Sequence, residues 1–497
     1  MNRIFKHIPS LAAGALLSIG AASCDSYLDL EPKGEALLVS TQDYLGLIED
    51  IMPNYDHSYS LNVCNEASWN KTEELKNYTI PLRSAAFLWD DSYDRAAITV
   101  DDYLYNACYN RITNYNIIIS NVHKAEGPDE EKALAMAQAR IMRAYNYFFL
   151  VNTYAKPYTA ATADQTDGII VREKMFESIE EKGVQQSVGY TYRFIQQDID
   201  EAIADLPHIA VNAFRPDRTF GYALKAKVHL FKLEIDECIS ACEAALAEAP
   251  EGKHELWDMN VEYNKYAPTF IRAYGTDRAI DDPMYMGVND QIENIWKNGV
   301  TRPYDAPDNL LYQFGLTYTD PFPMYVTKDV LDLFEPEADL RELYCIRYRR
   351  THETAPEGHR EFYSNGIKWN PSGMKLSEVY LMLAECYARK GTSADIAKAM
   401  DYLDQLRSKR IIASRYVRLN ATDAAEALRM VREERKRELF FTCNGFFDMR
   451  RFCTEFNETL TKEFDGKTYT LSPESSLLTF PFPMKAMQTS DLKQNSK

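Results

Sequence analysis

The sequence predicts a mainly α-helical protein in which pairs of helices stack as tetratricopeptide-like repeats, interrupted by one loop-rich insert. Apolar and small residues recur at helical spacing over long stretches, and two stretches carry small residues where paired repeat helices touch. The segment 251–371 differs, because it is rich in proline, glycine and aromatic residues. Since stacked repeats form one superhelix rather than separate globules, we expect a single domain over 24–497. Its parts would be 24–250, the aromatic insert 251–371, and 372–497.

Three helices are expected before the first repeat pair. Between Asp102 and Lys124 the apolar residues fall on one helix face, and further helices are predicted from about Glu130 to Tyr154 and from Tyr190 to Leu206. Pro157 and Pro207 follow the second and third of these stretches. Because proline cannot continue a helix, it marks where each one ends.

The clearest repeat pair is predicted from Tyr222 to Pro250. Small residues stand where the antiparallel helices of a tetratricopeptide pair touch, namely at Ala226, Cys238, Cys242 and Ala245. Cys238 and Cys242 are four residues apart, as two metal ligands on a helix would be, but their positions favour packing. A second pair is predicted from Lys375 to Arg410, with a turn near Gly391.

Residues 1–23 have the order of a secretory signal peptide that ends at a lipidated cysteine. Arg3 and Lys6 precede an apolar run from Leu11 to Ile19, and small residues come directly before Cys24. The run is shorter than the roughly 20 apolar residues that a spanning helix needs. We therefore expect cleavage before Cys24 and attachment to a membrane through lipid on its thiol. The alternative is ordinary cleavage with Cys24 merely nearby.

The composition argues against a nucleic-acid partner and predicts no metal or cofactor. The chain holds 56 Lys+Arg against 74 Asp+Glu, a net charge of -18 at pH 7, so a polyanion would be repelled. Nine cysteines are scattered without zinc-site spacing, and we interpret most of those after Cys24 as small buried apolar residues. Acidic pairs such as Asp90–Asp91 lack the spacing of a calcium loop, which favours a solvated acidic face.

No catalytic motif accompanies the predicted fold. The sequence has no G-x-S-x-G elbow, no G-x-x-x-x-G-K-[ST] phosphate loop and no H-E-x-x-H helix. We therefore expect no enzymatic activity. Carboxylates are abundant, however, and only the fold brings the two members of a glycosidase pair together, so an exported glycoside hydrolase stays open as an alternative.

Ligand binding suits the sequence better than catalysis. A sugar presents apolar ring faces and a rim of hydroxyls, so its site needs aromatic rings beside polar side chains. Two segments supply this mixture, the stretch before the first predicted helix and the aromatic insert. We expect ligand contacts at Trp69, Asn70, Trp89, Asp90, Trp296, Arg302 and Tyr304. Ordinary packing is the alternative for each ring taken singly, but we expect Trp89 or Trp296 to be an exposed stacking platform.

Five motifs in order resemble the SusD/RagB family over almost the whole chain. They are Cys24–Asp29 (CDSYLD), Ala137–Tyr158, Lys375–Glu385 (KLSEVYLMLAE), Glu433–Leu439 leading into Gly445–Arg451, and Phe480–Pro483 before Gln494–Asn495. Two departures stand in the fourth motif. Cys443–Asn444 replaces the family's usual acidic residue before Gly445, and Phe446–Phe447 replaces a more usual Arg-aromatic pair.

The charged residues of the fourth motif are interpreted as packing contacts. Arg435, Arg437 and Arg450 are expected to pair with carboxylates such as Glu434 and Asp448 across helices. The departures nearby therefore concern the subfamily rather than the fold.

The resemblance implies a lipid-anchored component of a nutrient uptake system in the outer membrane of Bacteroidetes. Such a protein captures an oligosaccharide reversibly at the cell surface and passes it to a TonB-dependent transporter of the SusC type. An oligopeptide ligand, which some members of the family take, is one alternative. Another is a lipid-anchored repeat scaffold that binds only proteins.

Overall fold

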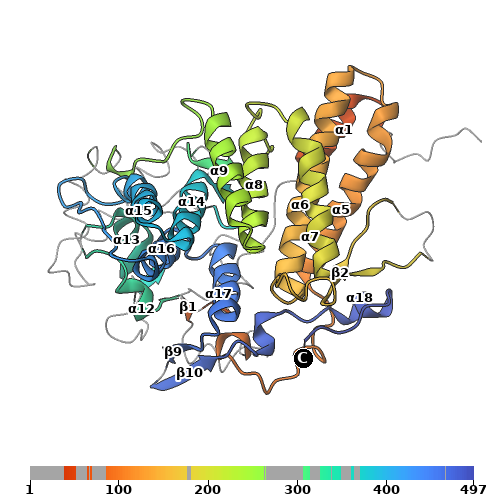
Figure 1. Ribbon diagram of the computed structural model, residues 1–497. Helices are drawn as coiled ribbons and strands as arrows, with labels where there is room; N and C mark the ends of the chain where they lie inside the picture. Colours follow the sequence, from red (N-terminus) through yellow and green to blue (C-terminus); the bar gives the residue numbers. More distant parts are fainter. Residues whose placement is uncertain are drawn as a thin grey trace, which may run out of the picture. The chain divides into compact units, whose positions relative to one another are not determined.

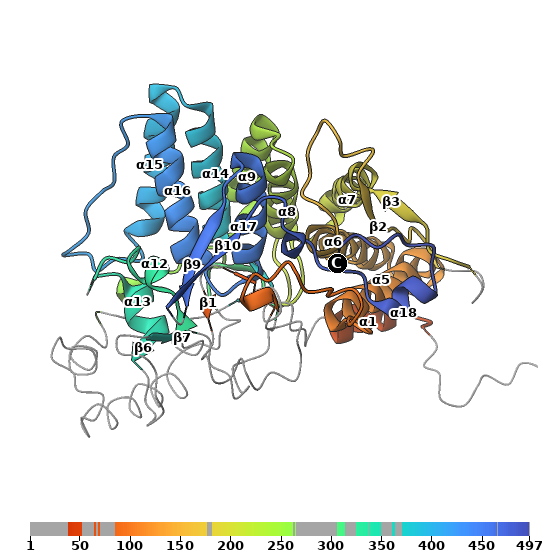
Figure 2. The same ribbon diagram turned by 90° about the horizontal axis from the view of Figure 1, so that it is seen from below.

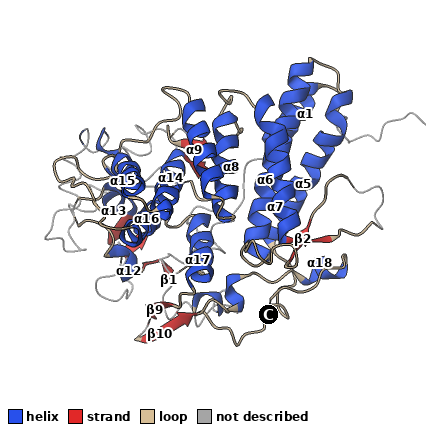
Figure 3. Cartoon of the chain, in the orientation of Figure 1, coloured by secondary structure: helices blue, strands red, loops and turns tan. Residues whose placement is uncertain are grey.

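The computed structural model describes residues 38–51, 64–65, 68–69, 85–175, 181–261, 264, 306–313, 325–336, 338–348, 360–362, 370–464 and 466–496. Helices dominate, as predicted (Figures 1 and 3). By their contacts, residues 40–497 form one compact unit. Cys24 and the predicted signal peptide lie outside the described residues. In the part of the chain that the structure describes, no helix is both long and apolar enough to cross a membrane.

The first helices form a bundle in which α6 packs against both of its sequence neighbours, α5 and α7. Their bounds confirm the three predicted helices: α5 is Tyr103–Asn121, α6 is Asp129–Tyr154 and α7 is Val188–Ala202. Two begin at side-chain caps that accept a backbone N–H, Asp102 for α5 and Ser187 for α7. Helix α1 (Thr41–Ile51) also contacts α6, and β2 (Asp167–Ile170) pairs antiparallel with β3 (Gln185–Ser187).

Both predicted repeat pairs are present. The first comprises α8 (Arg218–Phe231) and α9 (Ile235–Glu248), and the second α14 (Leu376–Lys390) and α15 (Ser393–Arg407). Gly391 ends α14 with φ 73°, a left-handed conformation that glycine adopts without a Cβ clash. Because α9 also packs against α14, the two pairs stack directly although the aromatic insert separates them in sequence (Figure 1).

The small residues of the first pair lie at helix contacts. Ala226, Cys238, Cys242 and Ala245 all have 0% exposed surface. Cys386 of α14 is equally buried, and the Cys238 thiol contacts it across the interface between α9 and α14. The expectation that these cysteines fill packing positions is therefore confirmed.

After the second pair, α16 (Ala424–Leu439) packs on α14 and α15. Helix α17 (Cys443–Phe456) leads into a hairpin of β9 (Leu460–Phe464) and β10 (Lys467–Leu471). The short helix α18 is Met484–Gln488. The C-terminal tail folds back on itself, because the Gln494 side-chain amide accepts from the Phe482 backbone N–H at 2.8 Å and donates to its carbonyl at 3.0 Å. This contact explains why the last family motif joins two separated stretches.

The three arginines of the fourth motif are expected from the sequence to pair with carboxylates across helices. This is confirmed for Arg435, whereas Arg437 pairs within its own helix and the prediction for Arg450 is wrong. Arg435 pairs with Asp448 at 2.7 Å, and Arg437 pairs with Glu434 at 2.7 Å within α16. Arg450 has 1% exposed surface and donates to the backbone carbonyls of Asn152 and Ala155 instead of to a carboxylate. The last carbonyls of α6 have no partner within their helix, so a cation is favoured there. Burial lowers the pKa of Arg450 to about 10.

The described parts of the aromatic insert consist of short elements. They are β4 (Asn309–Leu311), β5 (Tyr325–Val326), α12 (Lys328–Leu331), α13 (Leu340–Cys345), β6 (Ile346–Tyr348) and β7 (Arg360–Phe362). Strand β4 pairs antiparallel with β8 (Met374–Lys375), directly before α14. The insert is thus joined to the second repeat pair where that pair begins.

Candidate ligand-binding site

A four-stranded sheet joins the two segments from which the sequence predicts ligand contacts. Its order is β1-β5-β7-β6, where β1 (Ser68–Trp69) comes from the N-terminal stretch and the other strands come from the aromatic insert. Strands β1 and β5 are antiparallel, with Ser68 opposite Val326 and Trp69 opposite Tyr325. Figure 2 shows β1, β6 and β7 near α12 and α13. Segments far apart in sequence therefore meet in one sheet.

The helix that leads into the sheet belongs to a buried cluster of charges, which we name the arginine clamp. It consists of Arg341, Arg407, Arg410 and Arg437 around Glu434 and Glu438. Arg341 belongs to α13, which runs directly into β6. Its guanidinium donates to Asp339 and Glu434 at 2.7 Å each, and to Glu438 at 3.0 Å. These ion pairs attach the insert to α16 at α13, the helix that precedes strand β6.

Two further arginines of the clamp come from the end of the second repeat pair. Arg407 is the last residue of α15 and Arg410 stands three residues later, and each donates at 2.7 Å, to Glu434 and Glu438 respectively. Arg410 also accepts the Leu340 N–H through its backbone carbonyl at 2.8 Å, which ties the first residue of α13 to the repeat. These contacts hold the base of the insert against the second repeat pair.

Both carboxylates of the clamp are ionised at neutral pH. Burial alone would raise the pKa of Glu434, but the guanidinium groups of Arg341, Arg437 and Arg407 outweigh it and hold that pKa well below its usual range. The same competition, with Arg410 and Arg341 as the cations, lowers the pKa of Glu438 to about 2. A fully charged buried cluster fixes the orientation of α13 and of the strand that follows it.

Trp89, one of the two rings of which we expected at least one to be an exposed platform, is an interior ring. It has 5% exposed surface, and its indole N–H donates to the Cys64 carbonyl at 2.9 Å. The ammonium of Lys462, from β9, lies 4.4 Å from the Trp89 ring centroid and 4.3 Å from that of Phe87. The ring therefore packs the hairpin against the N-terminal stretch, and the cation over its face adds to that contact.

The other predicted contacts fall into two groups. Asp90 is half-buried, and its carboxylate accepts from the Ser92 backbone N–H at 3.0 Å and from the Ser92 hydroxyl at 2.5 Å, which caps a turn. Trp69 lies in β1 beside the insert. The remaining predicted contacts lie outside the described residues: Asn70, Trp296, Arg302 and Tyr304.

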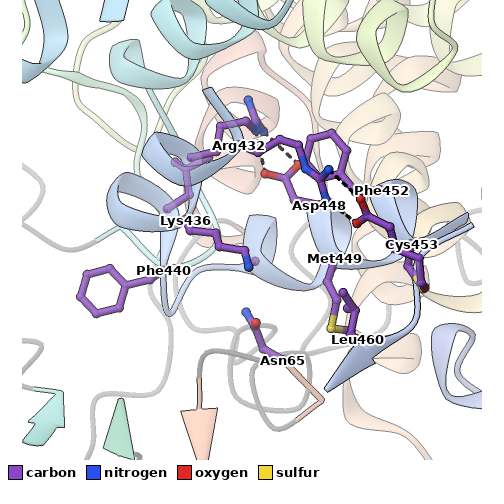
Figure 4. A pocket seen from close by; sticks show the side chains of 13 residues that line it. Asn65, Arg432, Lys436, Phe440, Asp448, Met449, Phe452, Cys453 and Leu460 are labelled. Carbon is purple, nitrogen blue, oxygen red and sulfur yellow. Dashed lines mark hydrogen bonds and ion pairs between the residues drawn. The ribbon is translucent and has the colours of Figure 1, made fainter. Parts of the chain in front are cut away.

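A small cavity lies between α16, α17 and Asn65 (Figure 4). Its walls carry the ion pairs Arg432–Glu458 at 2.5 Å and Arg435–Asp448 at 2.7 Å. The volume is about 50 Å³. A cavity needs about 10 to 15 Å³ of such volume to hold one water, so this space has room for a few waters and not for a sugar ring. Within the described residues, no three His, Cys, Asp or Glu side chains gather in a way that would hold a metal ion.

Comparison with known families agrees with the motifs. Residues 26–230 match a SusD-like family model described as starch-binding and associating with the outer membrane, and residues 348–488 match the model of the SusD family. The chain belongs to the SusD/RagB family. The resemblance that the five motifs indicated is therefore confirmed. Among curated proteins, none matches the sequence significantly.

Solved structures confirm the fold of this SusD-family chain. A SusD superfamily protein from Bacteroides thetaiotaomicron is 17% identical with a TM-score of 0.65, covering 92% of this chain and 100% of its own. A SusD-like carbohydrate-binding protein from Bacteroides vulgatus is 14% identical, with a TM-score of 0.59 and coverages of 91% and 97%. A laminarin-binding SusD-like protein is also 14% identical, with a TM-score of 0.57 and coverages of 92% and 98%.

Proposed function

We propose that this protein is a cell-surface lipoprotein that binds an oligosaccharide reversibly and delivers it to a TonB-dependent transporter of the SusC type. Membership of the SusD/RagB family supports the proposal, as does the description of related structures as carbohydrate-binding or laminarin-binding. The observation that carries it is the pairing of β1 with β5. This pairing brings the two aromatic segments together in one sheet, and the arginine clamp holds α13, the helix that leads into that sheet.

The proposed contacts are the predicted residues other than Trp89 and Asp90, whose side chains bond elsewhere in the protein. Trp69 lies at the junction of the two segments, while Asn70, Trp296, Arg302 and Tyr304 are proposed from the sequence. Rings would stack on the apolar faces of the sugar, and the polar side chains would bond its hydroxyls. Binding and release make or break no covalent bond. Hydrolysis of the bound glycan by the purified protein would contradict this mechanism.

The membrane anchor is proposed to be lipid on Cys24. The mature protein would then lie at the outer membrane beside its transporter, opening to admit the oligosaccharide and closing to present it for import. The expected partner is a SusC-like barrel. Co-purification of the two proteins from detergent-solubilised outer membranes would test this part of the proposal.

Ligand binding is tested with the soluble chain 25–497, which keeps the compact unit 40–497. An array of glycans, with laminarin oligosaccharides among them, and an array of peptides would identify the ligand class. Isothermal titration would then compare Trp69→Ala and Trp296→Ala with Tyr103→Ala, whose ring is 63% exposed on α5. We expect each of the first two changes to weaken glycan binding by about 1 to 3 kcal/mol and the control to have no effect.

Two results would contradict the proposal. Peptide binding without glycan binding would change the ligand class to an oligopeptide. Full glycan affinity in both tryptophan variants would mean that the glycan does not bind at the sheet.

A further inference from the structure

A second and larger cavity lies where the first repeat pair meets the start of the aromatic insert. Its walls come from residues 210–217 before α8, residues 252–254 after α9, and residues 306–310, which lead into β4. The volume is about 310 Å³. Small-molecule sites in proteins start at about 300 Å³, so this repeat-end cavity has room for one ring-sized ligand. None of its lining residues belongs to the β1-β5-β7-β6 sheet.

One wall of the repeat-end cavity carries an ammonium group without a carboxylate partner. Lys253 Nζ donates to the Ala210 carbonyl at 2.6 Å, and no described acidic side chain lies within ion-pair distance of it. Burial lowers the pKa of Lys253, while the more distant charge of Asp217 acts in the opposite direction. An ammonium has three N–H donors, so two remain for a ligand.

The neighbouring His254 bonds to a buried carboxylate that also caps α8. Asp217, with 0% exposed surface, accepts from the Phe220 backbone N–H at 3.1 Å and from His254 Nε2 at 2.6 Å. A carboxylate at Nε2 favours the tautomer with its proton there, which leaves Nδ1 as an acceptor. His254 has 5% exposed surface, and its Nδ1 has no hydrogen-bond partner among the described residues. Since buried polar atoms are nearly always hydrogen-bonded, a donor is missing at this position.

Most of the remaining lining is apolar or neutral, but Arg215 also lines the cavity, and its guanidinium donates to the Gln138 side-chain oxygen at 2.8 Å and to the Leu45 carbonyl at 3.0 Å. Val211, 83% exposed, stands at the cavity with Pro307 and Leu310. The cavity thus combines the Lys253 ammonium, the His254 acceptor and apolar surface with a second cation, Arg215, that already has acceptors. A monoanion suits it better than a dianion such as phosphate, because the Asp217 carboxylate in the lining offsets one of the two cations. A hydroxylated monocarboxylate suits it well, since the carboxylate meets Lys253 and a hydroxyl meets His254.

We propose that the repeat-end cavity is a second ligand site, which binds the carboxylate of a sugar acid at Lys253 and a hydroxyl of the same ligand at His254. The site does not depend on the proposed oligosaccharide site, because the two share no residue. It would let the protein hold an acidic sugar, free or as the end of a longer glycan, away from the sheet.

Isothermal titration and saturation-transfer NMR on the soluble chain 25–497 test the proposal with D-glucuronate as the probe. Glucose lacks the carboxylate and acetate lacks the hydroxyls, so both serve as ligand controls. We expect glucuronate to bind roughly tenfold or more tightly than either, because a charge-assisted hydrogen bond is lost in one case and a neutral one in the other. A longer glycan that ends in glucuronate, binding as tightly as the monomer, would identify a glycan end as an accepted source.

Lys253→Met removes the ammonium and keeps most of the side-chain volume. We expect this change to weaken glucuronate binding roughly tenfold or more. Lys225→Met is the matched control, because Lys225 is on α8 and pairs with Asp200 outside the cavity. His254→Gln should reduce the preference for glucuronate over acetate, and a thermal melt would check that this variant is folded.

Three results would overturn the inference. Glucuronate could bind no more tightly than glucose, or bind Lys253→Met as well as the unchanged protein. Alternatively, Trp69→Ala could abolish glucuronate binding while Lys253→Met leaves it intact, which would place the probe at the sheet. Failure of the oligosaccharide proposal would appear separately, as glycan binding that neither tryptophan variant affects.

Discussion

Replacing Glu434 with glutamine tests whether the arginine clamp stabilises the protein. The Glu434 side chain has 0% exposed surface and accepts from three guanidinium groups, those of Arg341, Arg407 and Arg437. Glutamine keeps the shape, but it removes the negative charge and turns one acceptor into an NH₂ donor that faces donors. The three arginines would then share less negative charge in a site from which water is excluded.

The expected loss follows from the contacts that remain. Removing one partner of a buried ion pair costs about 3 to 5 kcal/mol, because the other charge stays buried without compensation. Here each arginine keeps another acceptor, since Arg341 still bonds Asp339, Arg407 still bonds Glu335, and Arg437 still donates to the Leu333 carbonyl. We therefore expect Glu434→Gln to lower the free energy of unfolding by an amount near the lower end, about 3 kcal/mol.

The adjacent Glu433 provides a matched control, because the same substitution there removes only a surface charge. It pairs with Arg429 at 2.7 Å, with side chains 31% and 56% exposed, and such pairs contribute about 0 to 1 kcal/mol. Urea denaturation of both variants at neutral pH would give the two free energies of unfolding. Hydrogen exchange over residues 338–348 would show whether the base of the sheet loosens. A Glu434→Gln variant no less stable than Glu433→Gln would refute the reasoning.

Further predictions concern packing, acid stability and anchoring. Trp89→Ala should lower the free energy of unfolding by about 3 to 5 kcal/mol, because it empties a buried ring site, and thermal melts against Trp296→Ala would measure this. Ala226→Phe should cost about 1 to 3 kcal/mol or more by overpacking the repeat, whereas Cys238→Ala should be mild. The folded pKa of Glu438, about 2, lies below the unfolded value near 4.3. Ionised Glu438 therefore contributes about 3 kcal/mol to the free energy of unfolding above a pH of about 4.3, and this contribution is lost as the pH falls toward 2. In an acid titration of stability, Glu438→Gln should lack that loss. Cys24→Ser should yield a folded protein that no longer partitions with membranes in a strain without the barrel partner, as fractionation would show.

The repeat helices could be predicted because their signals are local. Small residues at helix contacts, such as Ala226 and Ala245, are fixed by spacing within one hairpin, and Gly391 stops α14 through its own backbone conformation.

The acceptors of Arg450 could not be predicted from local signals. They are two carbonyls at the end of α6, and because every residue has a carbonyl, nothing in the sequence distinguishes these two.

The arginine clamp combines local and distant partners. Glu434 and Arg437 stand three residues apart on one helix, so their contact follows from helical geometry. Arg341 and Arg407 come from the insert and from the second repeat pair, and only the fold brings them to Glu434. The sequence motif therefore identified the centre of the cluster but not its link to the insert, which is what positions the sheet.

Individual rings of the candidate site could not be assigned from sequence for the same reason. Trp69 and Trp89 both stand next to a polar residue in one irregular stretch, so composition treats them alike. What separates them is distant in the chain, since Trp89 meets Lys462 of the C-terminal hairpin while the strand of Trp69 meets β5 of the insert. A two-residue strand carries no periodic signal, so its partner follows only from the tertiary structure. The composition of a segment can therefore predict that it binds a ligand. Which of its residues are exposed to that ligand depends on which distant element packs against the segment.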